Sequence, residues 1–285
     1  MTITRSHFLR LGLAAIAAIA MTPAATFAQT KTSYVFATEG AFPPFNMTSP
    51  TGELKGFEID MINEIGKRAG FDVKIIPQAW DGMIQGVIDG KYDGVIDSVS
   101  VTDKRREVID FSLPYTTGGS TFFVAKDSGL ELPGNGTSVD LADDAATQPA
   151  IADIAKVLAG KTVGVQVSTI QSTFLTKYLA DKGVTVRTYP NGPDVYHDLL
   201  NGRIDAGMAA ETNVAAFLEK NAAEAVKTGP SIKGGVMGTG SAVAIRKGNK
   251  DLQQKLDKGL KSMSDDGSLA ELSKKWFGMV ITPKL

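Results

Sequence analysis

The chain has 285 residues, a formal charge of −1 at neutral pH, no cysteine and two histidines. So small a charge argues against nucleic acid or an anionic membrane surface as partner. The absent cysteine excludes a thiolate metal site, a thiol nucleophile and a lipid-modified N-terminal cysteine, and two histidines argue against a histidine-rich metal site or a Ser-His-Asp triad.

The first 28 residues are typical of a secretory signal peptide. Arg5 and Arg10 flank the start of an apolar run over residues 11–21, and the small-residue pattern Thr26-Phe27-Ala28 follows. The run is about half of the roughly 20 residues that span a bilayer, so a retained anchor is the weaker interpretation. We expect cleavage after Ala28 and an exported, soluble chain of about 257 residues that is not a lipoprotein.

Strands and helices are then predicted to alternate. Strands are expected at 33–38, 73–76 and from 93 onward, with helices at about 58–70 and 83–90 between them. The same order recurs, with strands at 161–167, 184–188 and 202–206 and helices at 169–182 and 194–200. Alternation of this kind predicts a mainly parallel sheet covered by helices. The sequence therefore predicts two α/β lobes, with a ligand cleft beyond the carboxyl ends of their strands.

Two extended stretches, at 115–125 and near 229–235, are predicted to cross between the lobes. A strand at 241–245 and helices over 249–277 then return the chain to the first lobe. We expect a discontinuous first lobe of residues 29–117 and 236–285 and a second lobe of residues 118–235. Within the second lobe, 128–160 is an insertion with a helix at 148–158, and it is either functional or a decorated loop.

The stretch from Asp93 to Arg106 combines a strand with polar chemistry. It begins with β-branched apolar residues, but Asp97, Ser98 and Ser100 interrupt them, and Arg105 follows with a guanidinium that matches the two oxygens of a carboxylate. An acid, hydroxyls and an arginine so close together could hold a small zwitterion. A strand end followed by a charged turn is the alternative.

Other candidate site residues lie just after predicted strands. The rings of Phe42 and Trp80 could sandwich a flat or cationic side chain, or could simply pack. Ser168 and Thr169 begin a helix, whose first N–H groups attract anions, although capping alone also explains them. Glu39 could face the cleft or be a solvated loop acid.

Five motifs, taken in order, resemble the polar amino-acid-binding proteins of bacterial ABC importers, which form solute-binding protein family 3. They are Gly56-Phe57-Glu58-Ile59-Asp60, Ser98-Val-Ser-Val-Thr-Asp-Lys-Arg105, Ile109-Asp-Phe-Ser-Leu-Pro-Tyr115, Gly202-Arg-Ile-Asp205 and Lys274-Lys-Trp-Phe277. Ala37-Thr-Glu-Gly40 and Gln78-Ala-Trp-Asp-Gly82 make the chain similar to the branch that binds basic amino acids and opines. The resemblance implies the type II periplasmic binding protein fold.

The resemblance also implies roles for single residues. In that family the position of Arg105 grips the ligand carboxylate, helped by backbone N–H groups at Ser100 and Thr169. Phe42 and Trp80 match positions whose rings flank the ligand side chain, and Glu39 matches an acid that meets a distal cation.

Two positions depart from the family pattern. Many members carry an aspartate for the α-ammonium where this chain has Ala210, and Glu211 is the nearest replacement. Ser168 replaces a common glycine before the carboxylate-binding turn.

We therefore expect a monomeric periplasmic receptor that binds a cationic amino acid of the arginine, ornithine, lysine or histidine type and passes it to an inner-membrane ABC permease. No cofactor or metal is expected. An octopine- or nopaline-like opine is the second candidate ligand, and a dehydratase-like enzyme or a sensor is less favoured. The predicted ligand-binding residues are Glu39, Phe42, Trp80, Asp97, Ser98, Ser100, Arg105, Ser168, Thr169 and Glu211.

Overall fold

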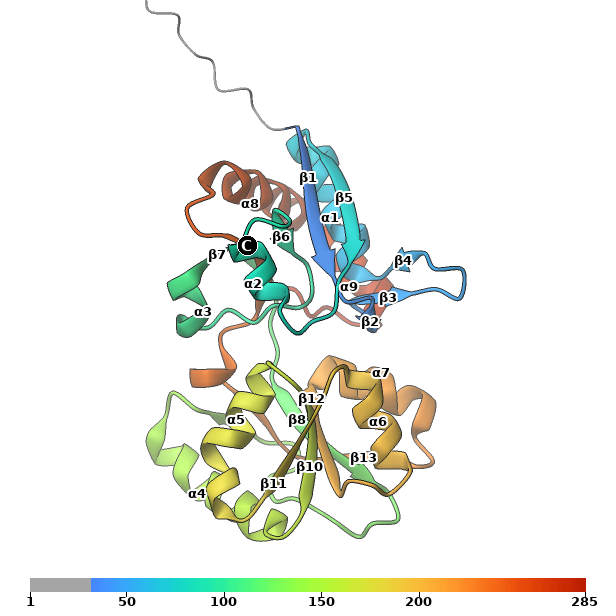
Figure 1. The fold of residues 1–285 in the computed structure, drawn as a ribbon, viewed down its shortest axis with the longest axis vertical. Coiled ribbons are helices and arrows are strands. Elements are labelled where there is room, and N and C mark those ends of the chain that lie inside the picture. The colour runs from blue at the N-terminus through green and yellow to red at the C-terminus, as the bar shows by residue number, and fades with distance from the viewer. Residues whose placement is uncertain (1–31) are drawn as a thin grey trace, which may run out of the picture. The chain divides into compact units, whose positions relative to one another are not determined.

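A computed structural model describes residues 32–285, whose strands form two large sheets and one small sheet (Figure 1). The predicted signal peptide lies outside the described residues. The first large sheet has the strand order β5-β1-β6-β14-β7, and the second has the order β11-β10-β12-β8-β13-β9. The chain therefore folds as two α/β lobes, as the alternating pattern predicts.

The first sheet is parallel in one half and antiparallel in the other. Its strands are β1 (Ser33–Thr38), β5 (Asp72–Pro77), β6 (Gly94–Val95), β7 (Ile109–Thr116) and β14 (Ser241–Arg246). Strand β1 is parallel to β5 and β6, whereas β14 is antiparallel to β6 and β7. The sheet is mixed because β14 enters it from the second lobe, so the expectation of a mainly parallel sheet holds for the β5-β1-β6 half only.

Helices cover both faces of this sheet. They are α1 (Phe57–Ala69), α2 (Met83–Ile88), α3 (Asp103–Val108), α8 (Lys250–Asp265) and α9 (Ser268–Phe277). The buried faces of α1, α8 and α9 pack on Tyr34, Phe36 and Ile245, and α2 packs on the other face. A short three-stranded sheet of β2 (Ala41–Phe42), β3 (Asn46–Thr48) and β4 (Leu54–Lys55) precedes α1.

The second sheet is built on the same plan. Its strands are β8 (Ser120–Ala125), β9 (Ser138–Asp140), β10 (Thr162–Gln166), β11 (Thr185–Tyr189), β12 (Ala206–Ala210) and β13 (Ala225–Lys233). Helices α4 (Asp144–Leu158) and α5 (Ile170–Tyr178) pack on one face, and α6 (Gly192–Leu200) and α7 (Glu211–Asn221) on the other (Figure 1). Strand β10 is parallel to β11 and β12, and β8 is antiparallel to β12 and β13.

Equivalent aspartates fix equivalent turns in the two lobes. The Asp93 carboxylate accepts a hydrogen bond from the backbone N–H of Val35 in β1 at 2.8 Å. The Asp205 carboxylate likewise accepts from the N–H of Thr162, the first residue of β10, at 2.7 Å. Each aspartate ties the turn before a middle strand to the beginning of the first strand in its run, which explains why the two sequence runs look alike.

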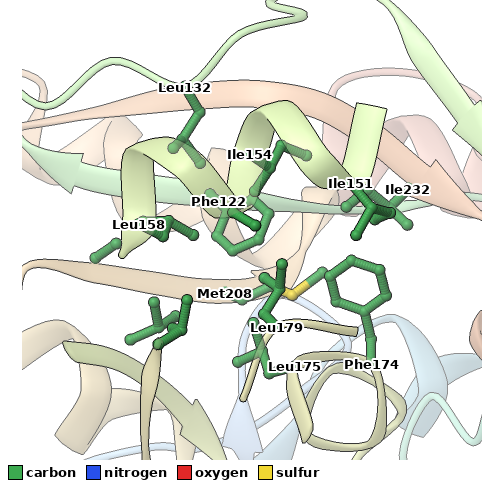
Figure 2. Close-up of a cluster of buried hydrophobic side chains, with 14 of the residues drawn as sticks. Phe122, Leu132, Ile151, Ile154, Leu158, Phe174, Leu175, Leu179, Met208 and Ile232 are labelled. Carbon is green, nitrogen blue, oxygen red and sulfur yellow. The ribbon is translucent and has the colours of Figure 1, made fainter. Parts of the chain in front are cut away.

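The stretch 128–160 is part of the core of the second lobe. Figure 2 shows Leu132, Ile154 and Leu158 packed with Phe122 and Met208, and each of them is almost fully buried. Helix α4 begins four residues before the predicted start, because the Asp143 side chain accepts the N–H of Ala145 at 3.1 Å and starts the helix there. Strand β9 extends the sheet beside β13. The stretch therefore completes the fold and is not a loose decoration.

The chain passes between the two large sheets twice, once from β7 to β8 and once from β13 to β14. The limits of the lobes at 117/118 and 235/236 remain a prediction, and both fall in these connections. Within residues 32–285, no helix is long and apolar enough to cross a membrane.

Candidate functional site

A cavity of about 990 Å³ is lined by residues of both large sheets and of the connections between them. Nine of the ten predicted ligand-binding residues line it, and Ser168 is the exception. The volume is at the upper end of the roughly 300–1,000 Å³ that is usual for small-molecule sites. The two runs of sequence therefore converge on one space large enough for an amino acid or a bulkier derivative.

Arg105 supplies a cation that no carboxylate of the described residues neutralises. Thr102 is the N-cap of α3, and its hydroxyl accepts a hydrogen bond from the backbone N–H of Arg105. The guanidinium donates to the carbonyl of Ser100 at 3.0 Å and lies over the ring of Trp80, 5.5 Å from its centroid. Within residues 32–285, no acidic side chain lies within 4.0 Å of it. Burial lowers the pKa of Arg105 to about 10, so it stays charged at neutral pH and is an anion site.

The start of α5 faces the same cavity from the second lobe. The Thr169 hydroxyl accepts from the N–H of Ser172 at 3.1 Å and donates to the carbonyl of Gln166 at 2.8 Å, so it caps the helix as expected. Thr169 lines the cavity beside Gln171, whose amide donates to Ser120 at 2.8 Å. The first N–H groups of α5 can complement the anion site at Arg105.

Ser168 has a different place from the one predicted. Its φ of +60° lies in the left-handed region, which explains why a glycine is favoured there. Its hydroxyl donates to the Asp81 carboxylate at 2.8 Å, outside the cavity lining. Ser168 therefore connects the two lobes beside the cavity, and the structure does not bring its side chain to the cavity wall.

Asp97 is the centre of an acidic group at the carboxyl end of β6. It is 6% exposed, and its Oδ1 accepts from the N–H of Glu39 at 3.1 Å and from Asn46 Nδ2 at 2.8 Å. Burial, followed by the charges of Glu58 and Glu39, raises the pKa of Asp97 well above its usual range. Asp97 and Glu39 line the cavity, whereas Glu58 lies behind them.

Glu58 is a site residue that the sequence reasoning missed. It is fully buried at the start of α1 and accepts from Asn46 Nδ2 at 2.8 Å, from the N–H of Ser98 at 2.6 Å and from the Tyr115 hydroxyl. Burial raises the pKa of Glu58, and these three donors oppose the rise. The helical spacing of the sequence could have indicated its burial, because Glu58 lies on the same face of α1 as the buried residues Ile62 and Ile65.

Glu58 also explains why the predicted strand from 93 onward is short. By accepting the Ser98 N–H it holds Ser98 in the left-handed region, with φ of +46°, so β6 ends at Val95. The Ser98 hydroxyl lies 2.9 Å from that of Ser241, and Ser100 forms an isolated bridge with the same residue. Ser98 and Ser100 line the cavity, but their contacts with Ser241 also connect this segment to β14 within the first lobe.

Glu39 meets a partner from the second lobe. Nε2 of Gln166 lies 3.0 and 3.1 Å from the two Glu39 oxygens. Burial raises the pKa of Glu39, and the Gln166 amide opposes the rise. Gln166 was also missed, although it lies at the carboxyl end of parallel strand β10, where ligand-binding side chains are expected.

The two aromatic candidates line the cavity in different ways. Trp80 is only 6% exposed and belongs to the core around α2, so it packs and faces the cavity at once. Phe42 is half-buried and stacks on Phe45 with ring centroids 5.7 Å apart. Their rings can flank a ligand side chain without leaving the positions that packing gives them.

Glu211 lines the cavity, but its carboxylate already has partners in its own lobe. It accepts from the Ser231 hydroxyl at 2.9 Å and lies 3.5 Å from Nζ of Lys227. Ala210, the residue before it, also lines the cavity. The expected substitute for the missing aspartate is therefore neutralised by a lysine.

The described residues contain no group of three or more His, Cys, Asp or Glu side chains that could hold a metal ion. From the part of the chain that the structure describes, the cavity instead offers the Arg105 guanidinium without an acidic partner, helix N–H groups, and the acids Asp97 and Glu39 without a basic partner, which suit a small molecule with charges of both signs. Two α/β lobes that share such a cavity define the class of two-lobed binding proteins.

The chain belongs to the bacterial extracellular solute-binding proteins, family 3, which match residues 34–279. It is 36% identical over 272 residues to the octopine-binding periplasmic protein of Rhizobium meliloti, covering 88% of this chain and 92% of that protein. It is 34% identical to the L-cystine-binding protein of Escherichia coli strain K12, covering 86% and 82%. Among solved structures, an ancestral arginine-binding protein bound to arginine is 30% identical with a TM-score of 0.72, covering 87% of this chain and 99% of that one. The family and fold implied by the sequence motifs are thereby confirmed.

Proposed function

We propose that this protein is the periplasmic substrate-binding component of an ABC importer and that its ligand is an amino acid with a cationic side chain. The observation that carries the proposal is the pairing of opposite charges in one cavity. Arg105 has no acidic partner, and Asp97 and Glu39 have no basic partner within 4.0 Å in the described residues. A ligand with a carboxylate and a distal cation satisfies both ends, whereas a purely anionic ligand brings a further negative charge to the acids.

A second ligand class, the opines, is supported by the region around Ala210. An ordinary amino acid presents an α-ammonium, which an acid usually meets, but Ala210 has no charge and Lys227 neutralises Glu211. A ligand whose α-nitrogen is substituted and carries a second acid group needs no acid there. The octopine-binding relative is consistent with this alternative. Arginine-like amino acids and arginine-derived opines therefore both remain candidates.

In this proposal the protein is a carrier and not an enzyme. Glu39 and Asp97 could serve as general acid or base, but compensation of a ligand cation explains both without chemistry. We further propose that the chain acts as a monomer in the periplasm after its signal peptide is removed, and that it passes its ligand to an inner-membrane permease.

Calorimetry with the purified protein tests the ligand class. The panel is arginine, ornithine, lysine, histidine, octopine, nopaline, cystine and glutamate. Tight binding of at least one cationic member supports the proposal, and octopine against arginine separates the two candidate classes. If glutamate bound tightly and none of the cationic ligands did, the assignment would be wrong.

A further inference from the structure

Three carboxyl groups lie together on the first lobe without a basic side chain. Asn46 Nδ2 joins two of them, at 2.8 Å from Glu58 Oε2 and 2.8 Å from Asp97 Oδ1. The third, Glu39, donates its backbone N–H to the same Asp97 oxygen at 3.1 Å. In the described residues, no lysine, arginine or histidine lies within 4.0 Å of any of the three. The donors to the three carboxyl groups are all neutral and supply no counter-charge, so full ionisation of the group is strongly disfavoured.

The two oxygens of Asp97 have different surroundings. Oδ1 accepts from three donors, which are the Glu39 N–H, Asn46 Nδ2 and the Thr38 hydroxyl at 3.3 Å. Oδ2 has no donor within hydrogen-bond distance in residues 32–285. Since Asp97 lines the cavity, Oδ2 is the oxygen left for a proton or for a ligand.

The charged and titratable groups nearest Asp97 on neighbouring elements are acids, which favour its protonated form. Glu58 from α1 and Glu39 after β1 are acids, and Tyr115 from β7 has its hydroxyl committed to Glu58. Arg105 on α3 lies against the Ser100 carbonyl and the Trp80 ring instead. Burial and the neighbouring acids raise the pKa of Asp97 well above its usual range, although the Glu39 N–H and the Asn46 amide oppose the rise.

We propose that Asp97 carries a proton on Oδ2 before the ligand binds, and that the cationic side chain of the ligand displaces this proton into the solvent. The O–H bond of the carboxylic acid breaks, the proton passes to buffer, and the carboxylate pairs with the entering cation. The neutral carboxylic acid is thus replaced by a carboxylate paired with the ligand cation, so the net charge at this place is the same before and after binding. This inference rests on the proposed function, because it requires a cationic ligand.

The exchange makes Asp97 a specificity-determining residue. As an acid, it offers an O–H donor to a neutral side-chain carbonyl, and as a carboxylate it accepts from a guanidinium or ammonium. Protons compete with cationic ligands for Oδ2 but do not compete with neutral ones. The affinity for arginine should rise with pH by up to about tenfold per unit below the pKa of Asp97, and the affinity for glutamine should not.

Calorimetry in buffers of different ionisation enthalpy measures the exchange directly. With arginine as the probe and octopine as the second probe, the dependence of the apparent binding enthalpy on the buffer should give about one proton released per ligand near pH 6. If neither probe binds, the cationic ligand of the panel that binds most tightly takes their place, and the proposed function fails if no cationic ligand binds. If either binds tightly and releases no proton between pH 5 and 8, the inference fails and the proposed function stands.

Single substitutions test whether Asp97 is the group that releases the proton. Asp97→Asn preserves the Oδ1 acceptor and should abolish both the proton release and the pH dependence of arginine affinity, while weakening arginine at least tenfold at pH 8. Asp89→Asn, an exposed aspartate outside the cavity lining, is the matched control and should release protons like the unmodified protein.

Glu39→Gln keeps the assignment testable if Asp97→Asn binds arginine too weakly for calorimetry. It leaves the Asp97 carboxyl in place, so proton release should persist. Release that persists in Asp97→Asn, or that disappears only in Glu39→Gln, would show that Asp97 is not the group that exchanges.

Discussion

Arg105 is the residue on which ligand affinity should depend most. Its guanidinium is positioned by the Ser100 carbonyl and the Trp80 ring and has no anionic partner among residues 32–285. Arg105→Ala leaves a ligand carboxylate without its charge-assisted hydrogen bonds in a largely desolvated cavity. We expect a loss of about 3 kcal/mol, which is more than a hundredfold in affinity by calorimetry.

Arg106→Ala is the matched control for this loss. The Arg106 side chain lies over the ring of Phe111, 5.6 Å from its centroid, and does not line the cavity. Its removal should leave affinity within about twofold. Equal losses in the two variants would show that the pair acts through general charge and not through a specific bond.

Asp97 should make the ligand-free protein less stable at neutral pH than in mild acid. A carboxyl whose pKa is raised on folding binds its proton more tightly in the folded state. Its stabilising contribution is complete below the unfolded pKa of about 3.9 and is lost as the pH rises through the folded pKa. Asp97→Asn removes this loss, so it should raise the melting temperature at pH 8 by about 2 °C or more and change it little at pH 4.

Thermal denaturation without ligand, at both pH values, measures this effect, with Asp89→Asn as the control. A variant that melts lower than the unmodified protein at pH 8 would mean that the Asp97 charge is compensated in the folded protein. A higher melting temperature of Asp97→Asn would also show that ligand binding costs stability, because the carboxyl group that destabilises the free protein is the one expected to meet the ligand cation.

At the scale of elements, the start of α1 depends on Gly56. Gly56 has φ of +137°, and a Cβ atom there would lie 2.3 Å from the carbonyl oxygen of Phe45. Because that oxygen accepts the N–H of Glu58 at 2.9 Å, the backbone cannot move aside without releasing the helix start. Gly56→Ala should therefore lower the free energy of unfolding by about 3 kcal/mol or more in denaturant titration.

Gly52→Ala separates the clash from the backbone preference. Gly52 also has a positive φ, +85°, but a Cβ atom there would meet nothing within 4 Å. This control should cost about 1 kcal/mol, the usual penalty for a left-handed backbone. If both variants cost the same, the close approach of Gly56 to Phe45 would not matter for stability.

The elements themselves could be predicted from the sequence because their signals are local. Strand β1 has the predicted bounds, and helix α2 begins at the predicted Met83 and ends at Ile88, two residues before the predicted end, since hydrophobic period and glycine positions decide both. Strand β6 is shorter than predicted because a distant residue, Glu58, turns Ser98 away from the extended backbone. Strand pairing is not local either, so the antiparallel half of each sheet could not be predicted from alternation.

The candidate site divides in the same way. The rule that side chains at the carboxyl ends of parallel strands bind ligands led to Glu39, Asp97 and Thr169. It does not say which side chains will be neutralised by partners far along the chain. The pairing of Glu211 with Lys227 and the contact of Glu58 with Asn46 are of this kind, and only the fold brings those residues together.

Export should remove the N-terminal segment of the chain. The N-terminal pattern predicts that a signal peptidase removes residues 1–28. Intact-mass and N-terminal analysis of protein from the periplasmic fraction should give a chain that begins at or within a few residues of Gln29. A chain that retains Met1 and sediments with membranes would contradict both the cleavage and the proposed location.

We expect the ligand to bring the two lobes closer together. Arg105, Asp97 and Trp80 belong to one lobe, and Thr169 and Gln166 to the other, yet all line one cavity. Direct contacts already connect the lobes, with Gln166 at 3.0 Å from Glu39 and Ser168 at 2.8 Å from Asp81. A ligand that contacts both lobes binds most tightly when the lobes are closed around it, so it shifts the population toward the closed state.

Saturating ligand should therefore reduce the radius of gyration in X-ray scattering and change the fluorescence of Trp80. The chain has a second tryptophan, Trp276, whose Nε1 donates to Asp60 at 2.9 Å, and Trp276→Phe isolates the signal of Trp80. Arg105→Ala at the same ligand concentration should show neither change, because it should bind more than a hundredfold less tightly. If calorimetry confirmed binding but both the radius and the Trp80 emission stayed constant, the ligand would contact one lobe alone, and the acidic group and Arg105 would have to hold it without Thr169.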